Sequence, residues 1–216
     1  MKVFLDVLSE IEEVAKKNSL PTIGPIKGKI IEKVIKQYKP KRLLEIGSLH
    51  GYSAILMANY VLKINHDYFY SGDADEKGSD TKKVIVTCLE IDKQLANITR
   101  KNIEKAGLSD RIKVITGDAL KIIPMLDKTQ KFDFVFLDAE KNQYFLYLKL
   151  LEENNLLDKK VTIVADNVLL YENEMKDYLD YVRNSGRYNS ITTETSLEFN
   201  KNIDDALEIS RTTTFG

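Results

Sequence analysis

The 216-residue sequence contains no tryptophan and only one cysteine, and it has no long apolar run. A single cysteine, Cys88, cannot form an internal disulfide, so we expect a protein of a reducing compartment, the cytoplasm. No signal peptide opens the chain and no segment is apolar enough to span a membrane, so we expect no membrane association. An excess of one charge is also lacking: 32 basic residues face 33 acidic ones, and a net charge of -1 creates no general attraction for nucleic acid.

The apolar content, 43% of the residues, is enough for one sizeable core, so we expect a single domain over residues 1–216. Apolar residues at helical spacing predict two helices ahead of Pro40, which would form an N-terminal helical cap over residues 1–40. The polar segment 63–83, which contains Gly72 and Gly78, is longer than an ordinary connection, and we therefore predict an inserted loop there.

Strands and helices alternate along the chain. Strands are predicted at 42–46, 84–90, 112–119 (a strand and its turn), 132–137, 161–165, 188–195 and 206–211. Helices are predicted at 3–17, 26–38, 52–61, 93–106, 120–126, 144–153 and 172–184. Such alternation predicts an α/β fold with a doubly wound, Rossmann-like parallel sheet and right-handed crossovers.

Two of the predicted strands end in polar side chains. Asp138 follows the aromatic and branched run 132–137, with Lys141 three residues later, and the pair Asp166-Asn167 follows the strand that ends at residue 165. Ligands of open α/β sheets bind outside the carboxyl ends of the strands, so these positions suit chemistry. Two carboxylates and an amide supply three oxygen ligands for a hard divalent cation. The alternative is that these residues only cap helices or close turns.

A second pattern indicates a nucleotide-like ligand. The glycine turn EIGSLHGYS (45–53) lies between a strand and a helix, but it is neither a GxGxxG motif nor a P-loop. Glu90 ends the next strand, where a carboxylate can accept hydrogen bonds from both hydroxyl groups of a ribose. Asp118, in the turn Gly117-Asp118-Ala119, could accept a hydrogen bond from an adenine amino group. Each acid alone could be a helix cap, but the three features in order indicate an adenosyl ligand without a pyrophosphate cradle.

Six stretches cover nearly the whole chain outside 63–83: GPIKGKIIEKVI (24–35), LLEIGSLHGYSAILMA (43–58), VTCLEID (86–92), FVFLDAEKNQY (134–144), LLEENNLLDKKVTIVADNV (150–168) and SLEFNKNIDDALEIS (196–210). In their order and spacing, the sequence resembles the S-adenosylmethionine-dependent, metal-dependent O-methyltransferases, and among them most the catechol O-methyltransferases. The resemblance implies a single methyltransferase domain of class I fold, with a seven-stranded sheet whose last strand is antiparallel.

The resemblance also implies roles by position. Asp138, Asp166 and Asn167 would bind Mg²⁺ or another divalent cation. Lys141 would act as the general base, and Glu198 would hold a substrate hydroxyl. The cofactor S-adenosylmethionine would be contacted by Ile23, Glu45, Gly47, Ser53, Glu90, Asp118, Ala119 and Asp138.

The implied reaction is Mg²⁺-dependent methyl transfer to a hydroxyl of a catechol-like small molecule, but the substrate walls depart from the family pattern. Glu140 stands where the family has a tryptophan, Ser19 where it has another aromatic residue, and Tyr171 where it has a proline. Relatives in the same superfamily methylate caffeoyl-CoA or a hydroxyuridine in tRNA. A tRNA methyltransferase using the same site therefore stays open, with the basic segment 36–42 as a candidate rim.

Two further alternatives concern the class of protein and its assembly. A non-catalytic adenosyl-binding protein would have little reason to carry Lys141 together with three oxygen ligands for a metal. A homodimer is left open, because nothing in the sequence decides the oligomeric state.

Overall fold

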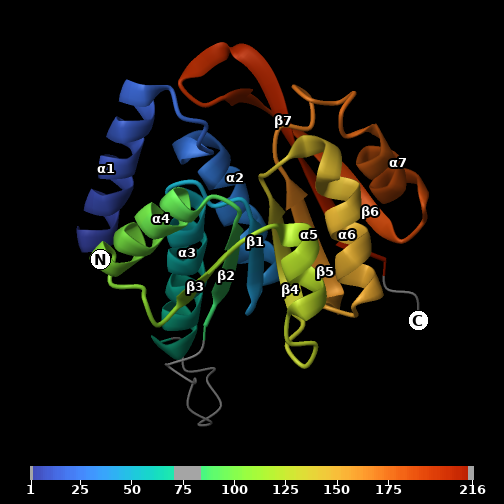
Figure 1. The fold of residues 1–216 in the computed structure, drawn as a ribbon, viewed down its shortest axis with the longest axis horizontal. Coiled ribbons are helices and arrows are strands. Elements are labelled where there is room, and N and C mark those ends of the chain that lie inside the picture. Colours follow the sequence, from blue (N-terminus) through green and yellow to red (C-terminus); the bar gives the residue numbers. More distant parts are fainter. Residues whose placement is uncertain (1, 71–83, 214–216) are drawn as a thin grey trace.

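The apolar run Phe132–Leu137 forms β4, the central strand of the sheet. Phe134 and Phe136 point into one apolar cluster, Val135 and Leu137 into another, and all four side chains are fully buried. A strand buried on both faces has to be apolar at every position, which explains the unbroken run. The sheet of this computed structural model therefore lies between two layers of helices (Figure 1).

The structure describes residues 2–70 and 84–213. Its strands are β1 (Leu43–Ile46), β2 (Val86–Glu90), β3 (Ile112–Thr116), β4 (Phe132–Leu137), β5 (Leu157–Ala165), β6 (Tyr188–Leu197) and β7 (Asn200–Thr212). In the described chain they form one seven-stranded sheet in the order β3-β2-β1-β4-β5-β7-β6. Strands β1 to β5 pair in parallel, whereas β7 is antiparallel to both of its neighbours, β5 and β6. The predicted doubly wound sheet with an antiparallel last strand is confirmed.

The helices are α1 (Lys2–Asn18), α2 (Gly24–Tyr38), α3 (Tyr52–Tyr70), α4 (Lys93–Lys105), α5 (Ala119–Ile122), α6 (Tyr144–Glu153) and α7 (Lys176–Asn184), with short 3-10 helices at Ile123–Met125 and Lys141–Gln143. Apolar residues of α1 to α4 pack in one cluster, and those of α5 to α7 pack in the other. No helix within the described ranges is long and apolar enough to cross a membrane.

Several predicted boundaries were wrong. Helix α3 continues to Tyr70, so the predicted inserted loop does not begin at residue 63. No glycine or proline lies between Gly51 and Gly72 to end the helix earlier. The part of that loop at 71–83 lies outside the described residues. Strand β5 begins at Leu157, four residues before its apolar part, and α7 begins only at Lys176, because turns occupy the residues after Tyr171.

The β6–β7 hairpin is longer than predicted. The pairing runs from Tyr188↔Thr212 to Leu197↔Asn200, which leaves Glu198 and Phe199 as a two-residue turn. The sequence around this turn is polar and reads as a loop, yet strands near a sheet edge can carry polar residues. Figure 1 shows the hairpin turn and the connection from α1 to α2 at the same end of the molecule. These two segments border the site described next.

Candidate active site

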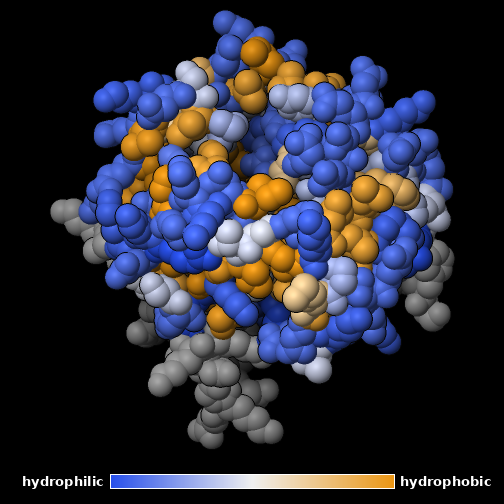
Figure 2. All heavy atoms as spheres, in the orientation of Figure 1, coloured by the Kyte–Doolittle hydropathy of each residue, from blue (hydrophilic) through white to orange (hydrophobic). Residues whose placement is uncertain are grey.

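A cavity of about 920 Å³ opens at the carboxyl ends of the parallel strands. The ends of β1, β2, β4 and β5 form its floor, and the α1–α2 connection and the β6–β7 turn form its border. Figure 2 shows a hollow in the upper part of the visible face, bordered by both polar and apolar side chains. Every predicted site residue lines this cavity except Glu45: Ile23, Gly47, Ser53, Glu90, Asp118, Ala119, Asp138, Lys141, Asp166, Asn167 and Glu198.

The glycine turn after β1 is tightly packed against the turn after β4. Gly47 has a φ of 89°, and a Cβ added there would collide with the carbonyl oxygen of Asp138. Only glycine combines this backbone conformation with so close an approach. The two halves of the site, one at β1 and one at β4, are thereby held against each other.

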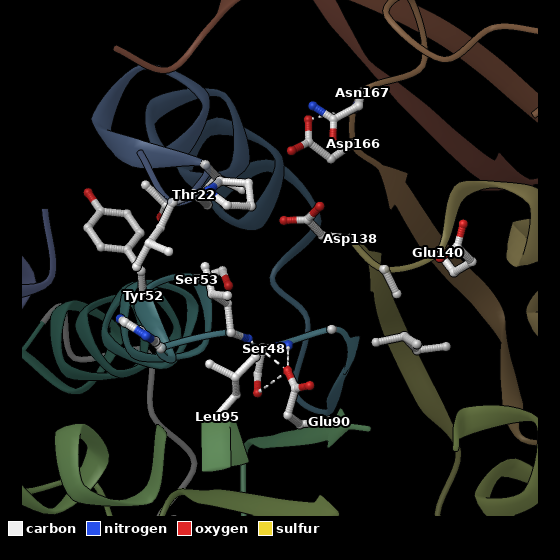
Figure 3. Close-up of a pocket in the computed structure, with 18 of the residues that line it drawn as sticks. Thr22, Ser48, Tyr52, Ser53, Glu90, Leu95, Asp138, Glu140, Asp166 and Asn167 are labelled. Carbon is white, nitrogen blue, oxygen red and sulfur yellow. Dashed lines mark hydrogen bonds between the residues drawn. The ribbon is translucent and has the colours of Figure 1, made fainter. Parts of the chain in front are cut away.

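Glu90 organises the loop that follows Gly47. Its Oε2 accepts the backbone N–H of Ser48 at 3.0 Å and of Leu49 at 2.9 Å, and its Oε1 accepts the N–H of Asp92 at 3.0 Å (Figure 3). The sequence predicted a ribose contact for this residue but not the backbone contacts. The ribose contact stays a prediction, and Glu90 also fixes the loop on which a nucleoside would rest.

Asp118 is compatible with both roles that the sequence suggested for it, a helix cap and an adenine contact. Its Oδ1 accepts the backbone N–H of Leu120 at 2.9 Å, so it caps the four-residue helix α5. Asp118 and Ala119 also line the cavity, next to the ends of β2 and β3. The adenine contact predicted for this turn is compatible with the cap and stays a prediction.

Glu45 lies behind the wall of the cavity rather than in it. Its side chain is fully buried, Ser53 donates its hydroxyl to Oε1, and Oε2 has no hydrogen-bond partner in the described chain. Burial, with smaller contributions from the charges of Asp138 and Glu90, raises the pKa of Glu45 to about 7. Glu45 therefore supports Ser53 from behind, and a direct cofactor contact by its side chain stays a prediction.

At the other end of the cavity lie the predicted metal ligands Asp138, Asp166 and Asn167 (Figure 3), and the predicted base Lys141 lines the same cavity. Asp138 and Asp166 end the neighbouring strands β4 and β5, whose last residues pair as Leu137↔Ala165. Lys141 Nζ lies 3.0 Å from Asp138 Oδ1 and 2.9 Å from the hydroxyl of the buried Tyr144. The pairing of adjacent strand ends thus places both carboxylates and the lysine in one site, as predicted.

The sequence analysis missed Lys27, which is buried in the same region. Its Nζ lies 2.5 Å from Asp166 Oδ1 and 2.6 Å from Oδ2 of Asp205, and the side chains of all three are almost inaccessible to solvent. Asp205 Oδ2 in turn accepts the side-chain amide of Asn167 at 2.7 Å. A signal was present: Lys27 interrupts the apolar stripe of α2 that includes Ile31 and Val34.

The pKa values of this cluster follow from burial and charge. Burial lowers the pKa of Lys27, but Asp166 and Asp205 outweigh it, so the pKa is raised and the ammonium stays charged. Burial and the neighbouring Asp138 carboxylate raise the pKa of Asp166 to about 6, despite the opposing effects of Lys27 and Lys141. Burial alone would raise the pKa of Asp205, but the hydrogen bonds from Lys27 and Asn167 bring this pKa below the ordinary value.

The donor set fits a hard divalent cation. Among the residues that the structure describes, no three His, Cys, Asp or Glu side chains could hold a metal together. A cation bound by Asp138 and Asp166 would therefore need a ligand of another type, and the amide oxygen of Asn167 could supply it. Two carboxylates and one amide are oxygen donors, which is the ligand class of Mg²⁺. After burial, the negative charge of Asp138 is the main cause that raises the pKa of Asp166. A cation bound between the two carboxylates would relieve this repulsion.

Proton competition gives a first prediction. A cation binds the ionised Asp166, and a proton binds it with a pKa of about 6, so cation affinity should be constant above that pH and fall below it. We expect a loss of about tenfold per pH unit below pH 6, measured as Mg²⁺ affinity by calorimetry with S-adenosylmethionine present. Affinity that stays constant on both sides of this pH would remove Asp166 from the ligand set.

Glu198, the predicted substrate contact, occupies the turn of the β6–β7 hairpin. Its carboxylate lies near the backbone N–H groups of Ile26, in the first turn of α2, and of Phe199, both of which act to lower its pKa. A Cβ added at Gly24 would collide with this carboxylate, so only glycine leaves it room. Burial raises the pKa of Glu198, and its buried Oε2 has no hydrogen-bond partner in the described chain. Glu198 lines the cavity, and its contact with a substrate hydroxyl stays a prediction.

The rim of the cavity is partly polar and partly apolar. Glu140 is exposed, Ser19 adopts a φ of 51° at the end of α1, and neither provides an apolar wall. Exposed apolar side chains come instead from Tyr171 on the β5–α7 connection and from Phe199 on the hairpin turn, over which Lys16 Nζ lies at 5.5 Å. The departures seen in the sequence therefore do concern the mouth of the cavity.

The fold and the site together define a class of protein. A parallel sheet extended by an antiparallel hairpin, with a glycine turn, strand-end acids and one cavity at the carboxyl edge, is the class I methyltransferase architecture. The chain belongs to the O-methyltransferase family, whose model matches residues 76–213.

Individual relatives agree with this membership. The chain is 33% identical to catechol O-methyltransferase of Bos taurus over 185 residues, which is 84% of this chain but only 60% of that protein. It is 32% identical to catechol O-methyltransferase of Sus scrofa over 185 residues, 84% of this chain and 88% of that one. The solved O-methyltransferase from Bacillus cereus, in complex with SAH, shares the fold with a TM-score of 0.75 at 24% identity, over 96% of this chain and 91% of its own.

Proposed function

We propose that this protein transfers the methyl group of S-adenosylmethionine to one hydroxyl of a small molecule that carries two adjacent phenolic hydroxyls, with a divalent cation, Mg²⁺ by preference, in the site. One observation carries the proposal: Asp138, Asp166, Asn167 and Lys141 meet in a single cavity that also contains the glycine turn. Support comes from the catechol O-methyltransferases among the relatives.

Different residues of the chain would hold the substrate and take its proton. A sulfonium methyl is already activated, and a divalent cation lowers the pKa of a bound hydroxyl and fixes its direction, which is the chemistry that these two groups supply when bound. Lys141 Nζ lies between Asp138 and Tyr144, and in its neutral form, which a bound cation beside it would favour, it would take the hydroxyl proton. Glu198, on the β6–β7 turn at the border of the cavity, would accept a hydrogen bond from the second hydroxyl and so orient the ring.

On the cofactor side, the chain provides a fixed surface rather than reacting groups. The loop after Gly47 is held by Glu90, and Ser53 is held by the buried Glu45. We propose that the nucleoside lies along this loop toward Asp118, with its methionine end toward Ser53. In this arrangement the methionine end would lie near Asp138, because Gly47 packs against the backbone of Asp138.

A substrate screen tests the proposal. Methyl transfer from labelled S-adenosylmethionine would be compared for simple catechols, caffeoyl esters and undermodified tRNA, each with Mg²⁺ and with excess chelator. We expect transfer to catechols that requires the cation. Transfer to tRNA alone, with no transfer to any vicinal diol, would replace the small-molecule substrate by the hydroxyuridine alternative.

The open mouth gives a second prediction. Because Glu140 provides no wall, Glu140→Trp should lower the Michaelis constant for a simple catechol a few-fold, as expected of one aromatic contact worth about 0.5–1.5 kcal/mol. The turnover number should stay nearly constant, since the reacting groups are unchanged. The exposed Glu153, on α6, gives the control Glu153→Trp, which should leave both constants unchanged. A raised Michaelis constant for Glu140→Trp would show that the acid itself contacts substrate.

A further inference from the structure

The buried Lys27–Asp205 pair has no part in the function described so far. Neither residue is a proposed cation ligand, yet the pair contacts both Asp166 and Asn167. Resting on the proposed cation site, we infer that Lys27 and Asp205 leave Asp166 and Asn167 one available oxygen each, as Lys141 does for Asp138. The site thereby favours a small six-coordinate cation over Ca²⁺.

Asp166 shows the restriction most directly. Its Oδ1 accepts from Lys27 Nζ at 2.5 Å and from the backbone N–H of Asn167 at 2.7 Å. In the described part of the chain, all side-chain hydrogen bonds of Asp166 fall on this oxygen, which leaves Oδ2 for a cation. A carboxylate with one oxygen held by two donors can bind a cation only through the other.

Asn167 is oriented by Asp205. A carboxylate only accepts hydrogen bonds, so the amide nitrogen of Asn167 has to face Asp205, and its oxygen has to face away. Asp205 is itself held by Lys27 at 2.6 Å. The backbone of Asn167 has a φ of 62°, a conformation that asparagine tolerates better than most residues. The neutral ligand is thus presented by its oxygen alone.

Asp138 is restricted by a different lysine. Its Oδ1 lies 3.0 Å from Lys141 Nζ, which leaves Oδ2 available. Three ligands with one available oxygen each make half of an octahedron, and Mg²⁺ requires near-octahedral geometry. Ca²⁺ takes six to eight oxygens and commonly uses carboxylates through both oxygens. The hydrogen bonds around the site therefore favour Mg²⁺ over Ca²⁺ through the number of oxygens that they leave available.

The cost of burying Lys27 supports a dedicated role. A buried ammonium between two carboxylates loses its hydration, and such groups are often no more stabilising than apolar residues of similar size. An apolar residue at this position of α2 would continue the stripe formed by Ile31 and Val34. What an apolar residue could not do is hold Asp166 Oδ1 and Asp205 at once.

The test is the ratio of Ca²⁺ to Mg²⁺ affinity, measured by calorimetry on the full chain with S-adenosylmethionine present. Lys27→Met removes a positive charge, which strengthens binding of both cations. It also removes one of the two donors on Asp166 Oδ1, so that this oxygen can approach a cation, which helps Ca²⁺ alone. We expect the ratio to move toward Ca²⁺ by about tenfold. Lys29→Met, an exposed position on the same helix, should leave the ratio unchanged. Equal gains for both cations would overturn the inference.

A second variant keeps the test decisive if Lys27→Met does not fold. Asp205→Asn retains the shape but no longer compels the amide of Asn167 to face it, so Mg²⁺ affinity should fall roughly ten- to hundredfold. Asp204→Asn, at the exposed neighbouring position, is the matched control. Unchanged Mg²⁺ affinity in Asp205→Asn would overturn this inference but not the proposed cation site. A wild-type protein that takes up S-adenosylmethionine but neither cation would overturn the proposed cation itself, and with it this inference.

Discussion

Replacing Asp166 with asparagine should lower the turnover number for a catechol at least about 10²–10³-fold, the range for loss of one preorganised electrostatic stabiliser. The reason lies in the two donors on Oδ1, Lys27 Nζ and the N–H of Asn167. An asparagine at this position has to turn its oxygen toward those donors, so its amino group faces the cavity where the cation would bind. The variant thus loses a ligand and a charge without losing volume.

The rest of the molecule should tolerate Asp166→Asn. Lys27 keeps its ion pair with Asp205, so the fold has no unpaired buried ammonium. Affinity for S-adenosylmethionine without metal should stay close to wild type, because the glycine turn and Glu90 are untouched. Asp177→Asn, at an exposed acid on α7, is the control. Wild-type turnover in Asp166→Asn would exclude a cation held by Asp166 from the reaction.

Replacing Lys141 with methionine is the second change with a large expected effect. Loss of a general base typically costs about 10²–10⁴-fold in rate, and Lys141 is the residue we propose to take the hydroxyl proton. The side chain is 14% exposed and is held by Asp138 and Tyr144, so a methionine of similar length can fill its place. The variant should fold and bind S-adenosylmethionine normally.

A substrate series separates a base from a residue that only shapes the site. A nitrocatechol is already ionised near neutral pH and needs no base, so Lys141→Met should lose much less activity on it than on a simple catechol. The exposed Lys101 provides the control Lys101→Met, which should behave as wild type on both substrates. An equal loss on the two substrates would assign Lys141 a positioning role instead.

The sequence was sufficient for the strands and for the residues at their ends. An unbroken apolar run such as 132–137 predicts a strand buried on both faces, and the acid that follows it has to lie at the carboxyl edge. Adjacent strands then bring Asp138 and Asp166 together without any knowledge of side-chain geometry. This is why the two carboxylates could be expected to lie together before the structure was known.

The contacts that depend on distant parts of the chain could not be predicted. Lys27 and Asp205 are separated by 178 positions, and the hydrogen bond between them appears only when α2 packs beside β7. Glu90 ends a strand as predicted, but its backbone partners lie on another loop. Glu198 was assigned a role by resemblance, whereas its packing against Gly24 depends on where the hairpin turn falls. Sequence patterns fix local structure and faces, and long-range packing decides the partners.

The central claim is that the cation and two adjacent hydroxyls act together in methyl transfer. The most direct measurement compares the rate of transfer of a labelled methyl group to catechol and to phenol, each titrated with Mg²⁺ and then with excess chelator. We predict transfer to catechol that rises with Mg²⁺ and is abolished by chelator, and no comparable transfer to phenol at any Mg²⁺ concentration. Undiminished transfer to catechol in excess chelator, or equal rates for catechol and phenol, would contradict the account.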